Sequence, residues 1–114
     1  MNDCIFCKIA AGEIPATVVY EDEYVIAFDD LNPQMPVHTL IIPREHHAHI
    51  GDNIPDELMG KLFNTVKKIA QIKGIAESGY RVIVNTGDDA QQSVHHIHVH
   101  VLGGAPMNSG SPAL

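Results

Sequence analysis

The chain has 114 residues, of which 45% are hydrophobic and 18% are charged, and its formal net charge is -7. This size and composition are typical of a globular protein, and we expect one domain over residues 1–114. The acidic balance excludes the broad basic surface that DNA, RNA or anionic membranes require, but it allows one small phosphorylated ligand. The sequence contains no run of about 20 apolar residues and no basic secretory start, so we expect a cytoplasmic protein.

The predicted elements are a short helix, three strands, a long helix and two further strands. The short helix covers 4–11, and the strands cover 18–21, 24–28, 38–43, 80–85 and 94–102. Short links between strands favour antiparallel pairing, so the predicted fold class is α+β with an antiparallel sheet of about five strands. We expect a core over about 4–104, followed by a loosely ordered tail over 105–114 that is rich in Gly, Ser and Pro.

The long helix has clear boundary signals. Leu58 and Leu62 begin an apolar series at helical spacing, and Gly74 is expected to end it. Asp52 or Asn53 suits the N-cap position, and Pro55, just after them, suits an early position in the helix. The apolar stripe of this helix is therefore expected to lie in the core.

The most informative segment is the run 94–102, in which His96, His98 and His100 alternate with aliphatic residues. Alternation at period two places the imidazoles on one strand face, with same-face neighbours roughly 6.6 Å apart, and the aliphatic side chains on the other. Histidine is a poor structural choice for a strand, but it suits proton transfer, nucleophilic attack and metal binding near neutral pH. The run therefore predicts a reactive patch.

Two chemistries fit this patch. One imidazole can attack an electrophile through one ring nitrogen while its other nitrogen donates a hydrogen bond. Gln92 and Ser93 just upstream, with Asn85 on the neighbouring strand, supply polar groups for phosphate oxygens, which favours displacement at phosphorus. Three histidines on one strand also suit a catalytic zinc ion, and the pattern by itself leaves both alternatives open.

The run 96–102 resembles the signature of the histidine triad (HIT) nucleotide-binding proteins, in which histidines alternate with hydrophobic residues. Further segments match the family in order, from about Cys4 to Gly104: 5–9, 12–16, 20–22, 28–30, 38–43, 80–85 and 92–94. The chain is most similar to the Hint branch, the purine nucleoside phosphoramidases. The resemblance implies the HIT fold, with the five-stranded sheets of two protomers joined across a homodimer.

The resemblance also implies an activity. The expected substrates are purine nucleoside 5′-phosphoramidates and aminoacyl-adenylates that carry an AMP or GMP moiety, cleaved through a covalent histidine–nucleotide intermediate without a catalytic metal. His98 is the implied nucleophile, with His100 and His38 assisting at the phosphate and His96 buttressing the site. Ser93 is the fifth implied catalytic residue and, with Gln92 and Asn85, contacts the phosphate or the leaving group. The implied nucleotide contacts, with Asp30 on the ribose hydroxyls, are Ile5, Phe6, Phe28, Asp29, Asp30, Leu31, Asn85, Gln92 and Ser93.

Cys4 and Cys7 form a C-x-x-C, which in a cytosolic chain points to zinc or redox chemistry rather than to a disulfide scaffold. Some HIT proteins carry a structural zinc on such a pair and two histidines, and the matching histidines here are His46 and His96. The resemblance thus implies a structural zinc site. Ordinary reduced thiols are the main alternative, and no thioredoxin-like pattern surrounds the pair.

Two features depart from the Hint pattern. His95 stands where tyrosine is common, and we expect it at an interface or on the surface. The tail over 105–114 lacks the Trp-containing ending of close Hint relatives, so the leaving group stays open. The alternatives to a phosphoramidase are a dinucleoside polyphosphate hydrolase or nucleotidyl transferase, and a nucleotide-binding interaction module with incidental activity.

Overall fold

The computed structural model describes residues 3–107, so the predicted tail lies outside the described residues from 108 onward. In chain order the elements are α1 (Ile5–Ala10), β1 (Val18–Glu21), β2 (Val25–Asp29), β3 (Val37–Pro43), α2 (Asp56–Ile72), β4 (Tyr80–Ile83), a 3₁₀ turn η1 (Asp88–Ala90) and β5 (Val99–Gly103). The predicted order of helices and strands is confirmed. No helix in the described part of the chain is long and apolar enough to cross a membrane.

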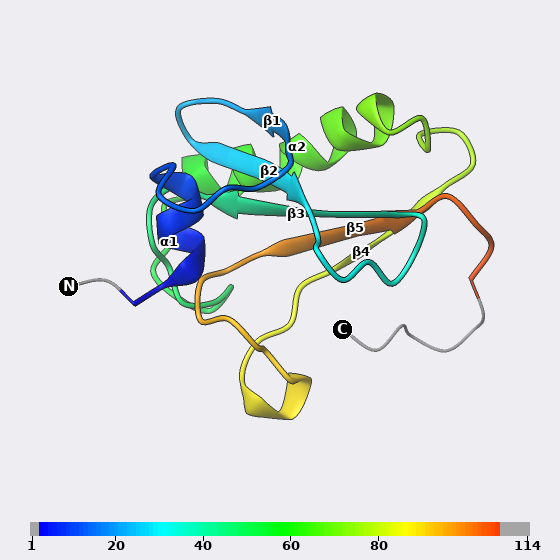
Figure 1. Cartoon of the computed structure of the whole chain (residues 1–114). Coiled ribbons are helices and arrows are strands. Elements are labelled where there is room, and N and C mark those ends of the chain that lie inside the picture. Colours follow the sequence, from blue (N-terminus) through cyan, green and yellow to red (C-terminus); the bar gives the residue numbers. More distant parts are fainter. Residues whose placement is uncertain (1–2, 108–114) are drawn as a thin grey trace.

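All five strands form one antiparallel sheet in the order β1-β2-β3-β5-β4 (Figure 1). A short turn over 22–24 joins β1 to β2 and the loop 30–36 joins β2 to β3, whereas α2 carries the chain from β3 to the edge strand β4. The last strand, β5, lies between β3 and β4, and its register pairs His100 with Leu40 and Leu102 with His38. The triad segment therefore occupies the middle of the sheet.

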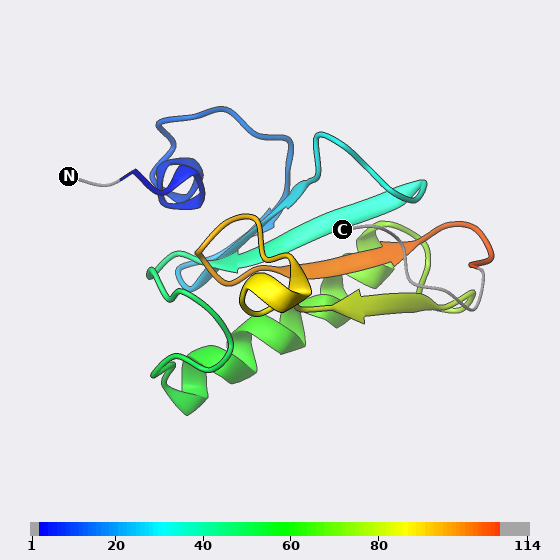
Figure 2. The ribbon, with the colours of Figure 1, turned by 90° about the horizontal axis from the view of Figure 1, so that it is seen from below.

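The two helices lie on opposite faces of the sheet (Figure 2), and an apolar cluster lies under each. On one face Leu62 and Ile69 of α2 pack with Val101 of β5. On the other face Phe6 of the much shorter α1 packs with Leu40 of β3. Each strand alternates its side chains between the two clusters, and both faces are buried at these points because a helix covers each one.

The triad strand is shorter than the predicted run 94–102, because regular pairing begins only at Val99. The neighbouring β3 ends at Pro43, which has no N–H for a further ladder bond, and the Pro43 carbonyl accepts a hydrogen bond from His96 Nε2 at 2.8 Å. The alternation of faces nevertheless continues: Ile97 is buried with Val99 in the α2-side cluster. The triad imidazoles lie on the α1 side, as the pattern predicted.

The predicted side-chain cap of α2 is wrong. Its N-cap is Pro55, which makes no capping hydrogen bond through its side chain. The Asp52 carboxylate instead accepts the backbone N–H groups of Ala48 and Asn53, at 2.9 and 2.8 Å, and so stabilises the turn before the helix. The first turn of α2 carries two acidic residues, which interact favourably with the helix dipole in place of a cap.

Candidate functional site

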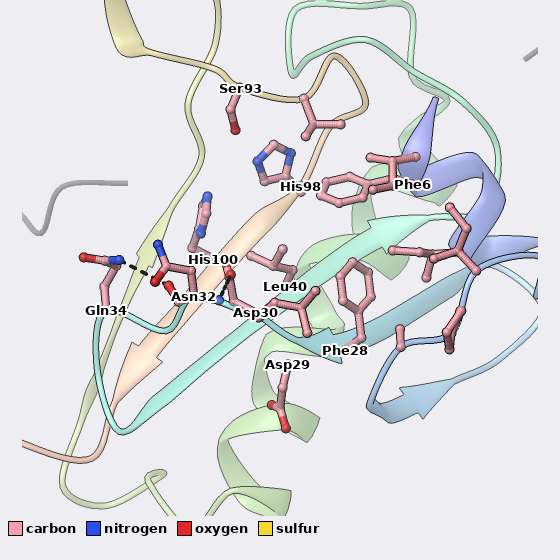
Figure 3. A pocket seen from close by; sticks show the side chains of 17 residues that line it. Phe6, Phe28, Asp29, Asp30, Asn32, Gln34, Leu40, Ser93, His98 and His100 are labelled. Carbon is pink, nitrogen blue, oxygen red and sulfur yellow. Dashed lines mark hydrogen bonds between the residues drawn. The ribbon is translucent and has the colours of Figure 1, made fainter. Parts of the chain in front are cut away.

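A cavity of about 310 Å³ opens on the α1 side of the sheet (Figure 3). Its wall is largely apolar and is formed by Ile5, Phe6, Ile9, Ile14, Pro15, Ala16, Phe28, Leu31, Leu40 and Val94. Its polar groups come from Asp29, Asp30, Asn32, Gln34, Ser93, His98 and His100. An apolar cavity with a few convergent polar groups is the usual form of a small-molecule site.

Most of the predicted nucleotide contacts meet at this cavity. Phe6 and Phe28 lie in its apolar wall. Leu31 also lines the cavity, although the residue is 95% exposed. Ser93 lies above His98 in Figure 3, with its hydroxyl directed toward the imidazole. These residues come from α1, β2 and the segment before β5, which are far apart in the sequence.

Two predicted contacts, Asn85 and Gln92, are not part of the lining. The amide of Gln92 is buried, and its oxygen accepts the backbone N–H of Gly87 at 3.0 Å. Its nitrogen donates to the carbonyls of Ala48 and Val94, at 2.7 and 3.0 Å. The side chain of Gln92 therefore holds three backbone segments together instead of facing the cavity.

The two adjacent aspartates face different surroundings. The Asp29 carboxylate points away from the cavity (Figure 3). It lies 2.8 Å from Nζ of Lys73, the C-cap residue of α2, and accepts a hydrogen bond from Thr39 Oγ1 at 3.0 Å. Asp30 stays at the cavity, where one carboxylate oxygen accepts the backbone N–H of Asn32 at 2.8 Å. Only Asp30 therefore has a carboxylate oxygen available to a ligand.

A chain of hydrogen bonds sets the proton positions of two imidazoles. The backbone N–H of Gln34 donates to His38 Nδ1 at 3.0 Å, so the proton of the neutral ring sits on Nε2. This Nε2–H donates to His100 Nδ1 at 2.9 Å. The proton of His100 must then be on its own Nε2, which makes His100 a hydrogen-bond donor at the cavity.

His98 has the opposite role. Its Nδ1 lies 2.8 Å from the backbone carbonyl of His96, which can only accept, so the proton sits on Nδ1 and Nε2 keeps its lone pair. The ring of Phe6 packs edge-on against His98, with centroids 5.1 Å apart, and the His100 ring lies 5.0 Å away. A neutral imidazole with a free Nε2 is a nucleophile.

Burial keeps these rings neutral. It lowers the pKa of His98 and of His38, and it lowers the pKa of His100 to about 4, with neighbouring imidazoles adding to the effect. The pKa of His96 is likewise lowered to about 4, mainly by burial. The hydrogen bonds of His38 and His100 require neutral rings, since Nδ1 of each ring accepts a hydrogen bond from its neighbour.

A second cluster lies beside the triad. The ligand atoms of Cys4, Cys7, His46 and His96 all lie within 4.8 Å of one another. Cys4 Sγ is 3.3 Å from His96 Nδ1, and Cys7 Sγ is 3.2 Å from His46 Nδ1 and 3.4 Å from His96 Nδ1. Zinc bonds of about 2.3 Å to sulfur and 2.0–2.1 Å to nitrogen place tetrahedral ligands about 3.5 Å apart, so the four residues fit zinc.

The surroundings of this cluster also suit a metal. His96 Nε2 donates to the carbonyl of Pro43 at 2.8 Å, which leaves the lone pair of Nδ1 directed toward the two thiols. The backbone N–H of Cys7 lies 3.3 Å from Cys4 Sγ and supports it as an acceptor. Such outer contacts are the usual means by which proteins orient zinc ligands.

The atoms of Asp30, His38 and His100 also lie within 4.8 Å of one another, but their hydrogen bonds do not suit a metal. Coordination through His38 Nε2 requires a proton on Nδ1, where the N–H of Gln34 already donates. The proton on Nε2 is accepted by His100, so these groups satisfy each other. This geometry disfavours a metal on Asp30, His38 and His100, which is a different set from the three strand histidines of the sequence prediction.

Several lining residues were not among the predicted nucleotide contacts. Asn32 and Gln34 belong to the irregular loop between β2 and β3, and Ile14 and Ala16 lie between α1 and β1. Loops lack the periodicity that identifies strand and helix faces.

Comparison with known proteins agrees with this geometry. Residues 11–107 match the family model of the HIT domain. The chain is 50% identical over 108 residues to the 14 kDa zinc-binding protein of Zea mays, covering 91% of this chain and 84% of that protein. It is 46% identical over 108 residues to adenylylsulfatase HINT1 of Arabidopsis thaliana, covering 91% and 73%.

The fold agrees as well. The structure matches that of a HIT family hydrolase from Legionella pneumophila Philadelphia 1 with a TM-score of 0.89 and 49% identity, covering 94% of this chain and 97% of that one. The family match spans most of the chain and includes the triad segment. With both sequence and fold in agreement, the chain belongs to the HIT domain family.

Proposed function

We propose that this protein hydrolyses purine nucleoside 5′-phosphoramidates and aminoacyl-adenylates through a covalent intermediate on His98. The observation that carries the proposal is the pair of imidazoles at the cavity. His98 has a free Nε2 and His100 has an Nε2–H donor, with ring centroids 5.0 Å apart. The name of the plant relative, adenylylsulfatase HINT1, supports an adenylyl group in the substrate.

In the first step, His98 Nε2 attacks phosphorus, and the bond from phosphorus to the leaving nitrogen or oxygen breaks. The Nδ1–H of His98 keeps its hydrogen bond to the His96 carbonyl, and this bond stabilises the positive charge that develops on the ring. His100 donates to a non-bridging phosphate oxygen. A departing amine needs a proton, which the hydroxyl of Ser93, above His98 in Figure 3, donates; Ser93 then recovers a proton from the water that attacks in the second step.

In the second step, water attacks phosphorus and the bond to His98 Nε2 breaks, which releases the nucleoside monophosphate and restores the neutral ring. The rest of the cavity suits the nucleoside. The base packs in the apolar wall around Phe6, Phe28 and Leu40, and the Asp30 carboxylate accepts the ribose hydroxyls. The purine therefore lies between α1 and the sheet.

Intact-protein mass spectrometry tests the proposal. Wild type and His98→Ala are mixed with adenosine 5′-phosphoramidate and quenched early under non-acidic conditions. We expect a transient adduct of one AMP on wild type and none on His98→Ala. The control is His95→Ala, a variant of the exposed histidine next to the triad, which should form the same adduct as wild type. Near-wild-type turnover by His98→Ala would show that the nucleophile is misassigned.

The same assay separates the alternatives. Faster turnover of diadenosine polyphosphates than of the phosphoramidate would favour a dinucleoside polyphosphate hydrolase. AMP binding without adduct or AMP release would favour an interaction module. Both comparisons use the same protein and the same AMP readout.

We also propose a structural zinc on Cys4, Cys7, His46 and His96, since the donor set fits and the maize relative is named a zinc-binding protein. Zinc there would cross-link α1 to the loop after β3 and to the triad segment. We expect elemental analysis to find one zinc per chain in wild type, and a loss of zinc in Cys7→Ser. No zinc in the purified wild type after zinc addition would contradict this site.

A homodimer with joined sheets is the third part of the proposal. β4 lies at the edge of the sheet, and its Tyr80 and Val82 are 37% and 40% exposed. An exposed apolar edge strand is a template for pairing with a second copy. We expect light scattering to give twice the chain mass, and Val82→Arg to give the monomer; a monomeric wild type at micromolar concentration would overturn the dimer.

A further inference from the structure

α1 belongs to both clusters of the site. Cys4 at its N-cap and Cys7 within it belong to the candidate zinc ligands, while Phe6 and Ile9 line the nucleotide cavity. A helix of six residues is far too short to be stable without tertiary contacts. Its position on the sheet, and with it one wall of the cavity, therefore depends on what its side chains bind.

His96 provides a second connection between the clusters. Its ring Nδ1 lies 3.3 and 3.4 Å from the sulfur atoms of Cys4 and Cys7. Its backbone carbonyl, 2.8 Å from His98 Nδ1, sets the proton position of the nucleophile. One residue thus serves as a metal ligand and as the group that orients His98.

Phe6 completes the link, because it stands between the two cysteines in the sequence. Its ring is buried and makes edge-on contacts with His98, Phe28 and His96, at centroid distances of 5.1, 5.5 and 6.1 Å. A shift of α1 moves this ring away from the nucleophile and from the apolar wall. The position of α1 therefore affects the shape of the nucleotide cavity through Phe6.

We propose that zinc held by Cys4, Cys7, His46 and His96 clamps α1 to the sheet and thereby sets the affinity of the cavity for nucleotide, with Phe6 as the positioning residue that couples the two sites. Without zinc, α1 opens more often, and nucleotide binding must then order it, which lowers affinity. The nucleotide as ligand rests on the proposed function above.

Thermodynamic linkage tests the coupling on the intact chain. AMP affinity is measured by titration calorimetry on zinc-loaded and zinc-free wild type, with circular dichroism to verify that both are folded. We expect at least about 5-fold weaker AMP binding without zinc, the lower end of typical couplings. By reciprocity, AMP must raise zinc affinity by the same factor, measured by competition with a chromophoric zinc chelator.

Two variants identify the coupling residue. In Phe6→Ala we expect zinc binding to persist and AMP affinity to become the same with and without zinc. Lys8→Ala, on α1 but outside both ligand sets, is the matched control and should keep the full dependence. The wild-type linkage stands as a test by itself if Phe6→Ala does not fold.

Each remaining outcome is decisive. Equal AMP affinity in zinc-loaded and zinc-free wild type overturns the clamp and leaves the proposed hydrolase intact. Failure to bind zinc also overturns the clamp alone. AMP binding in neither state overturns both the clamp and the proposed nucleotide chemistry.

Discussion

His38 Nε2 lies 2.9 Å from His100 Nδ1, while the other nitrogen of His38 accepts the backbone N–H of Gln34 at 3.0 Å. A backbone amide in the loop before β3 thus determines which nitrogen of His100 carries the proton. Because a backbone N–H cannot reverse its polarity, the direction of the whole chain of hydrogen bonds is fixed. His100 meets its ligand as a donor and His98 meets it with a lone pair.

Removal of His38 therefore impairs chemistry more than binding. In His38→Ala, His100 can adopt the other tautomer and loses its donor toward phosphate. We expect kcat on adenosine 5′-phosphoramidate to fall by about 10²-fold, the typical size of one acid–base or oxyanion contribution, with little change in KM. Steady-state kinetics measure both constants; an unchanged kcat would show that the His38–His100 contact does not control the tautomer.

The buried imidazoles make the fold sensitive to acid. The pKa of His100 is lowered to about 4 in the folded protein, against about 6.5 in the unfolded chain. Below pH 6.5 the unfolded chain binds a proton that the folded chain does not, so this contribution to stability is complete above pH 6.5 and is lost as the pH falls toward 4.

Urea unfolding of zinc-free protein between pH 7.5 and 4.5 measures this loss. We expect the free energy of unfolding to decrease with falling pH, and His100→Gln to show a shallower decrease than wild type. The lowered pKa values of Asp22 and Asp52 act only near and below pH 3.8, outside this window. A stability that is constant with pH would contradict the buried neutral ring.

Asp29 and Asp30 form a matched pair for separating stability from binding. Asp30→Ala removes the carboxylate at the cavity, so we expect AMP affinity to fall about 10-fold or more, the value of a charged hydrogen bond. Asp29→Ala breaks the ion pair with Lys73, with an expected cost of about 1 kcal/mol in stability and little change in AMP affinity.

Calorimetric AMP binding and urea unfolding distinguish the two variants. 2′,3′-Dideoxy-AMP serves as the ligand control, because it should bind wild type and Asp30→Ala with similar affinity. Loss of AMP binding in Asp29→Ala alone would show that the wrong aspartate was assigned to the ribose.

Two glycines predict opposite responses to the same substitution. A Cβ on Gly103 in β5 would lie 2.9 Å from Ile75 Cδ1 and 3.2 Å from the carbonyl of Gly79, so Gly103→Ala should destabilise the fold by about 1–3 kcal/mol. Gly60 is exposed within α2, and a Cβ there meets no atom within 4 Å. Gly60→Ala should stabilise the fold by about 0.5–1 kcal/mol.

Thermal unfolding of the two glycine variants beside wild type gives the sign directly. Equal shifts of Tm in the two variants would show that neither local environment decides the response. The measurement needs no ligand, so it tests the packing independently of the function.

Much of the fold was readable from local patterns. The alternation around His98 predicted which side chains face α2 and which face the cavity, and the helical spacing in α2 predicted its buried stripe. The true start of the β5 ladder was not readable, because it depends on Pro43 at the end of the neighbouring strand. The cap at Asp52 was mispredicted for a similar reason, since Ala48 competes for its carboxylate.

The sequence by itself determined the residue types, their faces and the family resemblance, because periodicity and motif spacing are properties of neighbouring residues. Only the tertiary structure decided that Asp29 pairs with Lys73, that the amide of Gln92 donates to the carbonyl of Ala48, and that His100 Nδ1 accepts from His38. Those outcomes depend on partners from other elements, brought into hydrogen-bonding distance by packing, and no local pattern encodes them.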